Sequence, residues 1–216
     1  MIRALVLTVC LAVLPGCALL RTPPPEPASG GQVQRLWLQR ANLLSVVTTF
    51  TVQGRVASSA VGFKADLRWK QFADDHFEMR VAGPFGARAA ELSGTPERVR
   101  VRTGQDQPEV TTDPEIWLQE AIGVRLPVRG LRWWALGLPD PAAPHQLSLD
   151  AAGRALRIEQ NGWVLDYIEY LPGGLLALPR RIDASDGNTR VIVLADQWRE
   201  LAPLPDELAA DVLPDN

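Results

Sequence analysis

The ten residues 61–70 alternate apolar and polar side chains without interruption. The apolar positions are Val61, Phe63, Ala65, Leu67 and Trp69. A side-chain period of two belongs to a β-strand, because an α-helix cannot keep alternate residues on one face. Strands of this kind cover a core with one face and meet water with the other. The segment therefore predicts a sheet with one apolar face.

Several other segments have the composition of strands joined by tight turns. Candidate strands lie at 76–81, 98–102, 146–150, 155–158, 163–170 and 189–195. Asn161-Gly162 favours the type I′ turn of a β-hairpin, which needs positive φ at both central residues. Asp186-Gly187 predicts another turn before the last of these strands. The series predicts a long antiparallel meander and not a βαβ repeat.

Three helices are expected beside the strands. Residues spaced by three or four positions predict an amphipathic helix over 32–47; they are Val33, Trp37, Arg40, Leu44 and Val47. Asp113-Pro114-Glu115 is typical of a helix start, and Gly123 of its end. Residues 131–136 before Gly137 predict a short helix. A few helices against one face of a curved sheet form an α+β architecture.

The first seventeen residues predict an export signal and a lipidation site. Arg3 precedes an apolar run at 4–14, which has the length of a signal-peptide core and is shorter than the roughly 20 residues that span a bilayer. The sequence Leu14-Pro15-Gly16-Cys17 resembles the bacterial lipobox, although Pro15 is unusual there. We expect cleavage before Cys17 and acylation of Cys17; the alternative is an ordinary signal peptide with an incidental cysteine. No acidic residue follows Cys17 directly, which favours export to the outer membrane.

Two segments are expected to lie outside the folded domain. Residues 21–31 contain four Pro, one Ser and two Gly, a composition typical of an extended tether with a flexible joint. Residues 203–216 are acidic and bounded by Pro. The predicted organisation is a signal peptide at 1–16, a lipidated cysteine with tether at 17–31, one domain at 32–202 and a tail at 203–216.

Composition argues against several classes of protein. The chain has 22 Lys plus Arg against 25 Asp plus Glu, so no basic excess marks a nucleic-acid binder. Two Cys and two His are too few for a disulfide scaffold or a zinc ribbon. The short motifs of serine hydrolases, zinc peptidases, P-loops and dinucleotide-binding folds are absent from the sequence, and His76 and His145 read as surface residues. We therefore expect no cofactor, no metal and no enzymatic activity.

Two features leave alternatives open. Arg98, Arg100 and Arg102 form a basic stripe on one strand face, which predicts a solvated edge first and contact with anionic headgroups second. The turn Gly83-Pro84-Phe85-Gly86 follows a strand and suits a type I turn with Phe85 at its tip. Phe85 either folds back onto the sheet or acts as an apolar probe toward a membrane or acyl chains.

The order of motifs along residues 32–200 resembles the LolB family of outer-membrane lipoprotein receptors. The segment GLRWWALGLP at 130–139 is the most specific of these motifs. The others are Trp37, Gly54-Arg55-Val56, Leu67-Arg68-Trp69, Gly83-Pro84-Phe85-Gly86, residues 122–128, Gln160-Asn161-Gly162-Trp163 and Pro179-Arg180-Arg181-Ile182.

The resemblance implies an incomplete antiparallel β-barrel with a few helices across its open face, enclosing a hydrophobic cavity. LolB-like proteins accept acylated lipoproteins from the periplasmic carrier LolA and insert them into the inner leaflet of the outer membrane without nucleotide hydrolysis. Outer-membrane phospholipid is then a further partner, and we expect a monomer. Phe85 stands where the family has a membrane-inserting Leu. Candidate acyl-chain residues, each with plain core packing as the alternative, are Phe63, Leu67, Trp69, Phe77, Met79, Val81, Trp117, Trp134 and Leu136.

Two other functions make different predictions. An envelope lipoprotein that acts as a scaffold would have a filled core and would bind no free lipid. An enzyme acting on lipid or peptidoglycan would require a polar residue that tolerates no replacement, with His76 and His145 as its best candidates.

Overall fold

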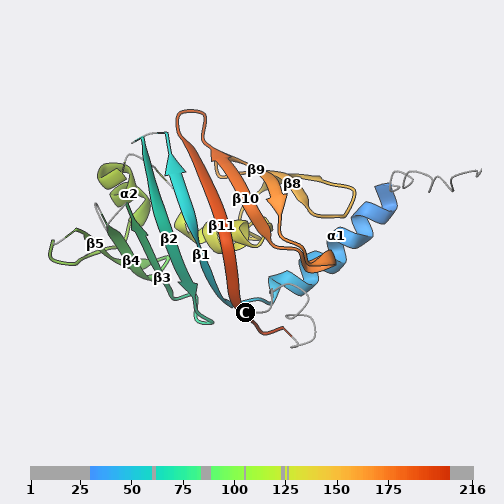
Figure 1. Ribbon diagram of the computed structural model, residues 1–216, viewed down its shortest axis with the longest axis horizontal. Coiled ribbons are helices and arrows are strands. Elements are labelled where there is room, and N and C mark those ends of the chain that lie inside the picture. Colours follow the sequence, from blue (N-terminus) through green and yellow to red (C-terminus); the bar gives the residue numbers. More distant parts are fainter. Residues whose placement is uncertain are drawn as a thin grey trace, which may run out of the picture.

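One curved antiparallel sheet dominates the computed structural model, which describes residues 30–59, 62–83, 89–104, 106–122, 125 and 127–204 (Figure 1). Its strand order is β6-β5-β4-β3-β2-β1-β11-β10-β9-β8-β7. The strands are β1 (Thr49–Ser58), β2 (Phe63–Gln71), β3 (Phe77–Ala82), β4 (Ala90–Thr95), β5 (Arg98–Thr103), β6 (Glu109–Thr111), β7 (His145–Leu149), β8 (Ala155–Gln160), β9 (Trp163–Tyr170), β10 (Pro179–Ser185) and β11 (Arg190–Ala202). Because β6 and β7 lie at opposite edges, the sheet is an open barrel, as expected for an α+β fold.

The helical segments in the described part of the chain are α1 (Gly30–Ser45), α2 (Pro114–Ile122), the 3₁₀ turn η2 (Val128–Gly130), α3 (Leu131–Ala135) and the 3₁₀ turn η3 (Gly174–Leu176). The segment from α2 to α3 joins the two edge strands of the sheet. Helix α1 extends away from the sheet on the side of β8 to β10 (Figure 1). Among the described residues, no helix has the length and apolar character needed to cross a bilayer.

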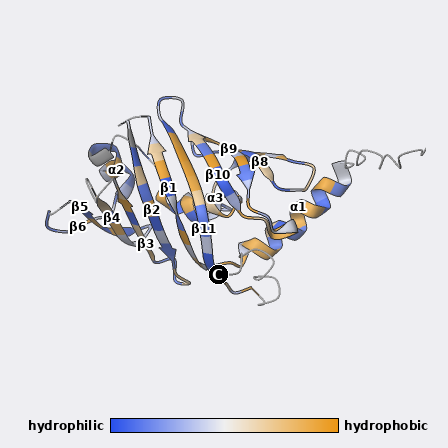
Figure 2. Cartoon of the chain, in the orientation of Figure 1, coloured by the Kyte–Doolittle hydropathy of each residue, from blue (hydrophilic) through white to orange (hydrophobic). Residues whose placement is uncertain are grey.

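The strand predicted for residues 61–70 is confirmed from residue 63 onward as β2, and Val61 lies outside the described residues. Ala65, Leu67 and Trp69 are buried, while Lys64, Asp66 and Arg68 are exposed. The same alternation of burial recurs in β5, and Figure 2 shows hydrophobic and hydrophilic residues alternating along the central strands. One face of the sheet, called here the inner face, therefore carries the core, and the other, the outer face, is polar.

Local sequence signals place several ends of these elements. Asn161 and Gly162 have φ values of 52° and 77°, which confirms the type I′ turn between β8 and β9. Asp113 caps α2, because its Oδ1 accepts a hydrogen bond from the Ile116 N–H at 3.1 Å. Gly137, with φ of 75°, follows α3 and donates its N–H to the Trp134 carbonyl at 3.1 Å.

The first and last strands pair in the middle of the sheet. The register of β1 with β11 runs from Thr49 opposite Ala202 to Ser58 opposite Val191, with a shift beside Gly54. A Cβ atom at Gly54 would lie 1.9 Å from the Leu194 carbonyl oxygen of β11. Glycine at this position therefore lets the two backbones approach closely.

Candidate functional site

An apolar cavity lies between the inner face of the sheet and the segment from α2 to α3. Its volume is about 180 Å³. Strands β1 to β4 and β9 to β11 supply most of its walls, and Leu118, Val128, Leu131, Trp134 and Ala135 supply the rest from α2, η2 and α3. Among its described lining residues, Ser58 and Arg180 are the ones that are neither apolar nor aromatic. We call this space the inner cavity.

A second space, called here the rim cavity, adjoins the inner cavity and has a volume of about 250 Å³. The two share the lining residues Trp69, Phe77, Met79, Val128 and Leu131. The rim cavity has more charged residues on its wall than the inner cavity, and four of them form two ion pairs. Arg129 Nη1 lies 2.6 Å from Glu97 Oε1, and Arg132 Nε lies 3.6 Å from Asp75 Oδ1. These pairs connect η2 and α3 to the turns that follow β4 and β2.

The structure brings six of the predicted cavity residues together. Leu67, Trp69, Phe77, Met79, Val81 and Trp134 all line the inner cavity. Trp117 and Leu136 are not among its described lining residues: Leu136 is fully buried in the core, and Trp117 donates its indole N–H to Glu109. The side chain of Phe63 lies outside the described part of the chain, as do Cys17, Pro84, Phe85 and Gly86. Gly83 is described and follows the end of β3.

Sequence reasoning missed the far wall of the inner cavity. Leu165, Ile182, Val191, Val193 and Trp198 come from β9, β10 and β11. Their strands meet β1 to β4 across the cavity only because β1 pairs with β11. No local pattern carries that pairing, so no local signal could have identified these residues as cavity wall.

Trp69 differs from other tryptophans in its hydrogen bonding. Its indole Nε1 is buried and has no hydrogen-bond partner among the described residues. By contrast, Trp134 donates to Gln160 Oε1 at 2.8 Å, and Trp198 donates to the Pro179 carbonyl at 3.2 Å. Both Trp69 and Trp198 pack on Phe50, with ring centroids 5.2 Å and 5.3 Å away, and both line the inner cavity.

This difference predicts unequal effects of two similar substitutions. Trp198→Phe should lower the free energy of unfolding by about 1–3 kcal/mol more than Trp69→Phe, because only Trp198→Phe strips a buried carbonyl of its donor. The loss of ring volume is the same in both variants and serves as the internal control. Urea denaturation followed by circular dichroism measures both values. Equal losses would mean that the Trp198 hydrogen bond contributes nothing net.

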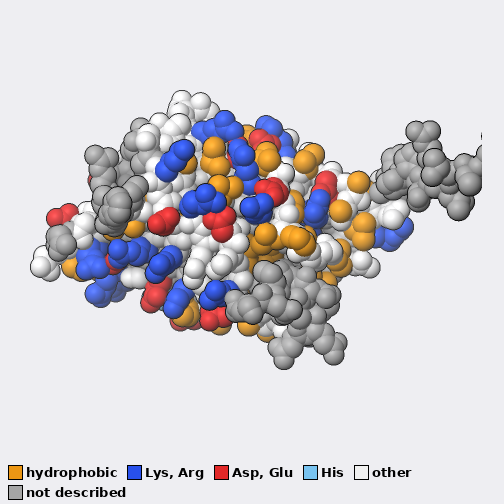
Figure 3. Space-filling view, in the orientation of Figure 1, with side chains coloured by type: hydrophobic (Ala, Val, Ile, Leu, Met, Phe, Trp, Pro, Cys, Tyr) orange, Lys and Arg blue, Asp and Glu red, His pale blue; other side chains and the backbone are white. Residues whose placement is uncertain are grey.

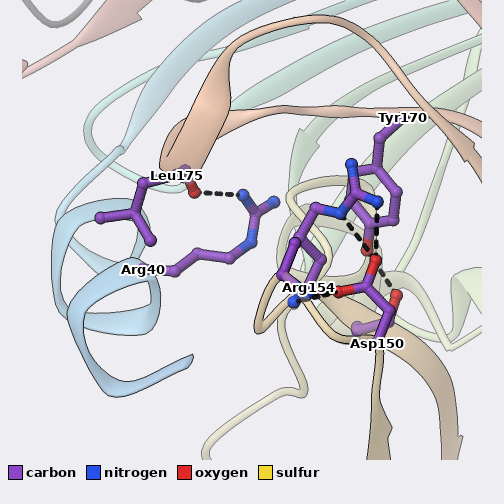
Figure 4. Close-up of polar contacts among 7 residues, drawn as sticks. Arg40, Asp150, Arg154, Tyr170 and Leu175 are labelled. Atoms are coloured by element: carbon purple, nitrogen blue, oxygen red, sulfur yellow. Dashed lines mark hydrogen bonds and ion pairs between the residues drawn. The ribbon is translucent and has the colours of Figure 1, made fainter. Parts of the chain in front are cut away.

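A buried arginine fastens α1 to the rest of the domain (Figure 4). Arg40 is fully buried and donates from Nη1 to the Leu175 carbonyl at 2.7 Å and from Nη2 to the Leu136 carbonyl at 3.3 Å. Its guanidinium also lies 5.4 Å from the centroid of the Tyr170 ring. No ion pair joins Arg40 to a carboxylate within the described residues, and its Nε has no hydrogen-bond partner there. Burial lowers the pKa of Arg40 to about 10, so the group still carries its charge at neutral pH.

The described residues contain no group of three or more His, Cys, Asp or Glu side chains placed to hold a metal ion. The His76 ring lies tilted against the Phe72 ring with centroids 5.6 Å apart, and His145 is exposed at the start of the edge strand β7. In the rim cavity, Asp75, Glu97, Arg129 and Arg132 form ion pairs, whereas Gln71 and Asp140 form hydrogen bonds with the backbone. The chemistry that the inner cavity offers is therefore the burial of apolar groups.

Comparison with known proteins gives concordant matches. Residues 48–198 match the family model described as "Outer membrane lipoprotein LolB". The chain is 34% identical over 200 residues to the outer-membrane lipoprotein LolB of Nitrosococcus oceani, covering 91% of this chain and 97% of that protein. It is 36% identical over 189 residues to the LolB of Halorhodospira halophila, covering 86% and 89%.

Two solved structures match this chain at low sequence identity. A DUF1329 family protein from Desulfovibrio piger has a TM-score of 0.51 at 6% identity, over 82% of this chain and 95% of that one. A LolA superfamily protein from Nitrosomonas europaea has a TM-score of 0.49 at 13% identity, over 82% and 96%. The family model spans most of the described sheet, and the sequence relatives cover nearly the whole chain. The chain therefore belongs to the LolB family of outer-membrane lipoproteins.

Proposed function

We propose that this chain is an outer-membrane lipoprotein receptor, anchored at the inner leaflet and facing the periplasm. It accepts acylated lipoproteins from a soluble carrier of the LolA type and releases them into the outer membrane. The observation that carries this proposal is the inner cavity, whose described lining is apolar on both walls apart from Ser58 and Arg180. No nucleotide and no enzymatic step are part of the transfer.

Acyl chains need such a cavity between two apolar environments. Each CH₂ group removed from water contributes about 0.8 kcal/mol, so a single long acyl chain in water costs on the order of 10 kcal/mol. Transfer proceeds when each acceptor binds the chains more favourably than the donor: carrier, then receptor, then bilayer. A receptor that bound the chains as well as the bilayer does would not release them.

The volume of the inner cavity implies that it widens when it is filled. Pockets for small ligands measure roughly 300–1,000 Å³, whereas the inner cavity measures about 180 Å³. Met79 is half-buried and lines both cavities, so a rotamer change there would join the two spaces. The ion pairs of Arg129 with Glu97 and of Arg132 with Asp75 lie on the wall that would move.

The anchor and the insertion turn complete the proposal. Cys17 carries the lipid, and the tether holds the domain near the membrane; it ends where α1 begins at Gly30, slightly before the predicted residue 31. Residues 83–86 join β3 to β4, two strands that contribute to the cavity wall. Phe85 in this turn is the apolar probe that enters the bilayer and helps the cargo leave.

The test separates acceptance of cargo from its delivery. A purified lipoprotein bound to its carrier is mixed with the receptor, and cargo is followed first to the receptor and then to outer-membrane vesicles. Met79→Glu should reduce acceptance at least about tenfold, because an unpaired carboxylate buried beside acyl chains costs several kcal/mol. Phe85→Glu should accept cargo normally and fail to deliver it.

Val164→Glu is the matched control for the cavity variant. Val164 is also half-buried, but it lies on the outer face of β9. The Val164→Glu variant should accept and deliver cargo as the parent protein does. If the parent moves no cargo, the chain is a scaffold and the receptor proposal fails. If Phe85→Glu delivers normally, the receptor proposal stands without a role for Phe85.

A further inference from the structure

The outer face of β2 to β5 is strongly basic, although the whole chain is acidic. These four strands contain seven Lys or Arg residues against three Asp or Glu residues, a net charge of +4, whereas the chain has a net charge of −3. All ten charged side chains occupy outer-face positions that alternate with the buried residues. Figure 3 shows Lys and Arg side chains gathered over the strands at the β3 to β5 end of the sheet. We call this surface the basic face.

The other half of the sheet handles its cations differently. Strands β8 to β11 carry five basic and six acidic residues. There, Arg157 pairs with Glu159 and Asp166, Arg180 pairs with Glu169, and Arg181 and Arg190 pair with Asp183. On the basic face, no ion pair with a described residue is found for Lys64, Arg68, Lys70, Arg98 or Arg100. Both halves are antiparallel meanders, so the fold alone does not account for this difference.

Some cations of the basic face lie opposite each other on neighbouring strands, which lowers the stability of the sheet. Arg68 on β2 lies directly opposite Arg80 on β3. Like charges in directly opposed positions destabilise an antiparallel pair. Glu91 offsets part of this, because it pairs with both Arg80 and Arg102, and the Arg102 hydrogen bond lowers the pKa of Glu91. The uncompensated remainder points to an anionic partner that is not part of this chain.

The composition of the basic face favours a lipid surface over a protein partner. Protein interfaces centre on aromatic or large aliphatic residues. The outer-face positions of β2 to β5 that are not charged hold only small residues: Ala82, Ser93 and Thr95. Many cations without an apolar anchor suit a fluid layer of anionic headgroups, to which each Lys or Arg adds a similar increment.

We infer that the basic face binds anionic phospholipid headgroups of the membrane to which the chain is tethered. The inference rests on the membrane anchoring in the proposed function. Twelve residues separate Cys17 from Gly30, and such a tether reaches at most about 40 Å. At that reach the membrane is present at high effective concentration, so weak contacts suffice to orient the domain.

The experiment places a fluorophore on each half of the sheet in the full-length, lipidated chain. Ser93→Cys puts the label in the basic face, between Arg100 and Glu78 in register. Val164→Cys puts it on the outer face of β9 as the control. Each protein is reconstituted without cargo or carrier in vesicles of phosphatidylcholine, or of equal parts phosphatidylcholine and phosphatidylglycerol, with a quencher on the lipid headgroups.

The label at residue 93 should be quenched several-fold more in the anionic vesicles than in phosphatidylcholine, and the label at residue 164 should not. Raising NaCl from about 0.1 M to about 1 M shortens the Debye length from about 10 Å to about 3 Å and should abolish the difference. The combined change Arg68→Gln, Lys70→Gln and Arg100→Gln should also abolish the difference in quenching between the two kinds of vesicle. Each of these cations is expected to increase the affinity for anionic lipid roughly fivefold. Arg157→Gln, Arg190→Gln and Arg199→Gln together form the matched control, because all three residues are exposed on β8 and β11, and they should leave quenching intact.

Two outcomes would overturn the inference. Quenching at residue 93 that is equal in neutral and anionic vesicles would show that charge does not orient the domain. Quenching that is absent in both would assign the basic face to an acidic protein or to solvent. Because no cargo is present in this experiment, neither result contradicts the receptor proposal. If quenching is as expected but the protein fails to transfer cargo, the receptor proposal is wrong and the inference about the basic face stands.

Discussion

Gly54→Ala is expected to lower the free energy of unfolding by about 3–5 kcal/mol, among the largest effects of any single methyl group in this domain. The added Cβ would lie 1.9 Å from the Leu194 carbonyl oxygen, and 3.1 Å from the Cα atom of Ala195. Both neighbours are backbone atoms, so the clash cannot be relieved by a rotamer change. Relief requires β1 and β11 to separate, which breaks the pairing at the centre of the sheet.

Gly30→Ala is the control for this prediction. Nothing lies within 4 Å of a Cβ at Gly30, which is the first residue of α1. Alanine is also the better helix former, so this variant should be as stable as the parent or slightly more so. Thermal melts of both variants compare the two sites. A melting temperature of Gly54→Ala within 2 °C or so of the parent would show that the two strands separate at little cost.

Arg40→Met is expected to lower the free energy of unfolding by about 2–4 kcal/mol. Methionine keeps most of the aliphatic volume but donates no hydrogen bond, so the carbonyls of Leu175 and Leu136 lose their donor. Removal of a desolvated cation offsets part of this loss, as the lowered pKa of Arg40 indicates. Because Arg40 joins α1 to η3 and α3, the Arg40→Met variant should show faster amide hydrogen exchange in α1 than the parent protein does.

Arg35→Met is the matched substitution on the same helix. Arg35 is exposed, so its replacement should change the unfolding free energy by less than about 0.5 kcal/mol. Arg40→Lys separates charge from geometry, since one ammonium group cannot reach both carbonyls in the way a guanidinium does. If Arg40→Met proves as stable as the parent, the desolvation of the cation outweighs its hydrogen bonds.

The sequence predicted those strands in which apolar and polar residues alternate without interruption. β2, β3 and β5 were predicted from alternation, and α2 from its cap at Asp113. The strands β1, β4 and β10 were not identified, because their patterns are interrupted. In β1 the interruption is Gly54 beside a register shift, and β10 begins at Pro179. In each case a requirement of the tertiary structure replaces the local alternation.

Prediction of the site reached one wall of the inner cavity and missed the other. Alternation in β2 and β3 identifies Leu67, Trp69, Met79 and their neighbours as inner-face residues. Spacing on α1 also placed Arg40 on the buried side of its helix. The hydrogen bonds of the buried Arg40 could not be predicted, because the carbonyls that accept them, at residues 136 and 175, are distant along the chain.

The pairing of β1 with β11 also has a consequence for how the protein is made. Val52 pairs with Trp198, so the central seam of the sheet joins the two ends of the domain. Each half of the sheet is a meander of local hairpins, which form quickly. The pairing of β1 with β11 forms more slowly, because it joins residues that are far apart in the sequence. Until β11 is available, the edge of β1 that pairs with it stays open. An open strand edge can pair with other chains, so the late closure of this pairing exposes the folding protein to aggregation.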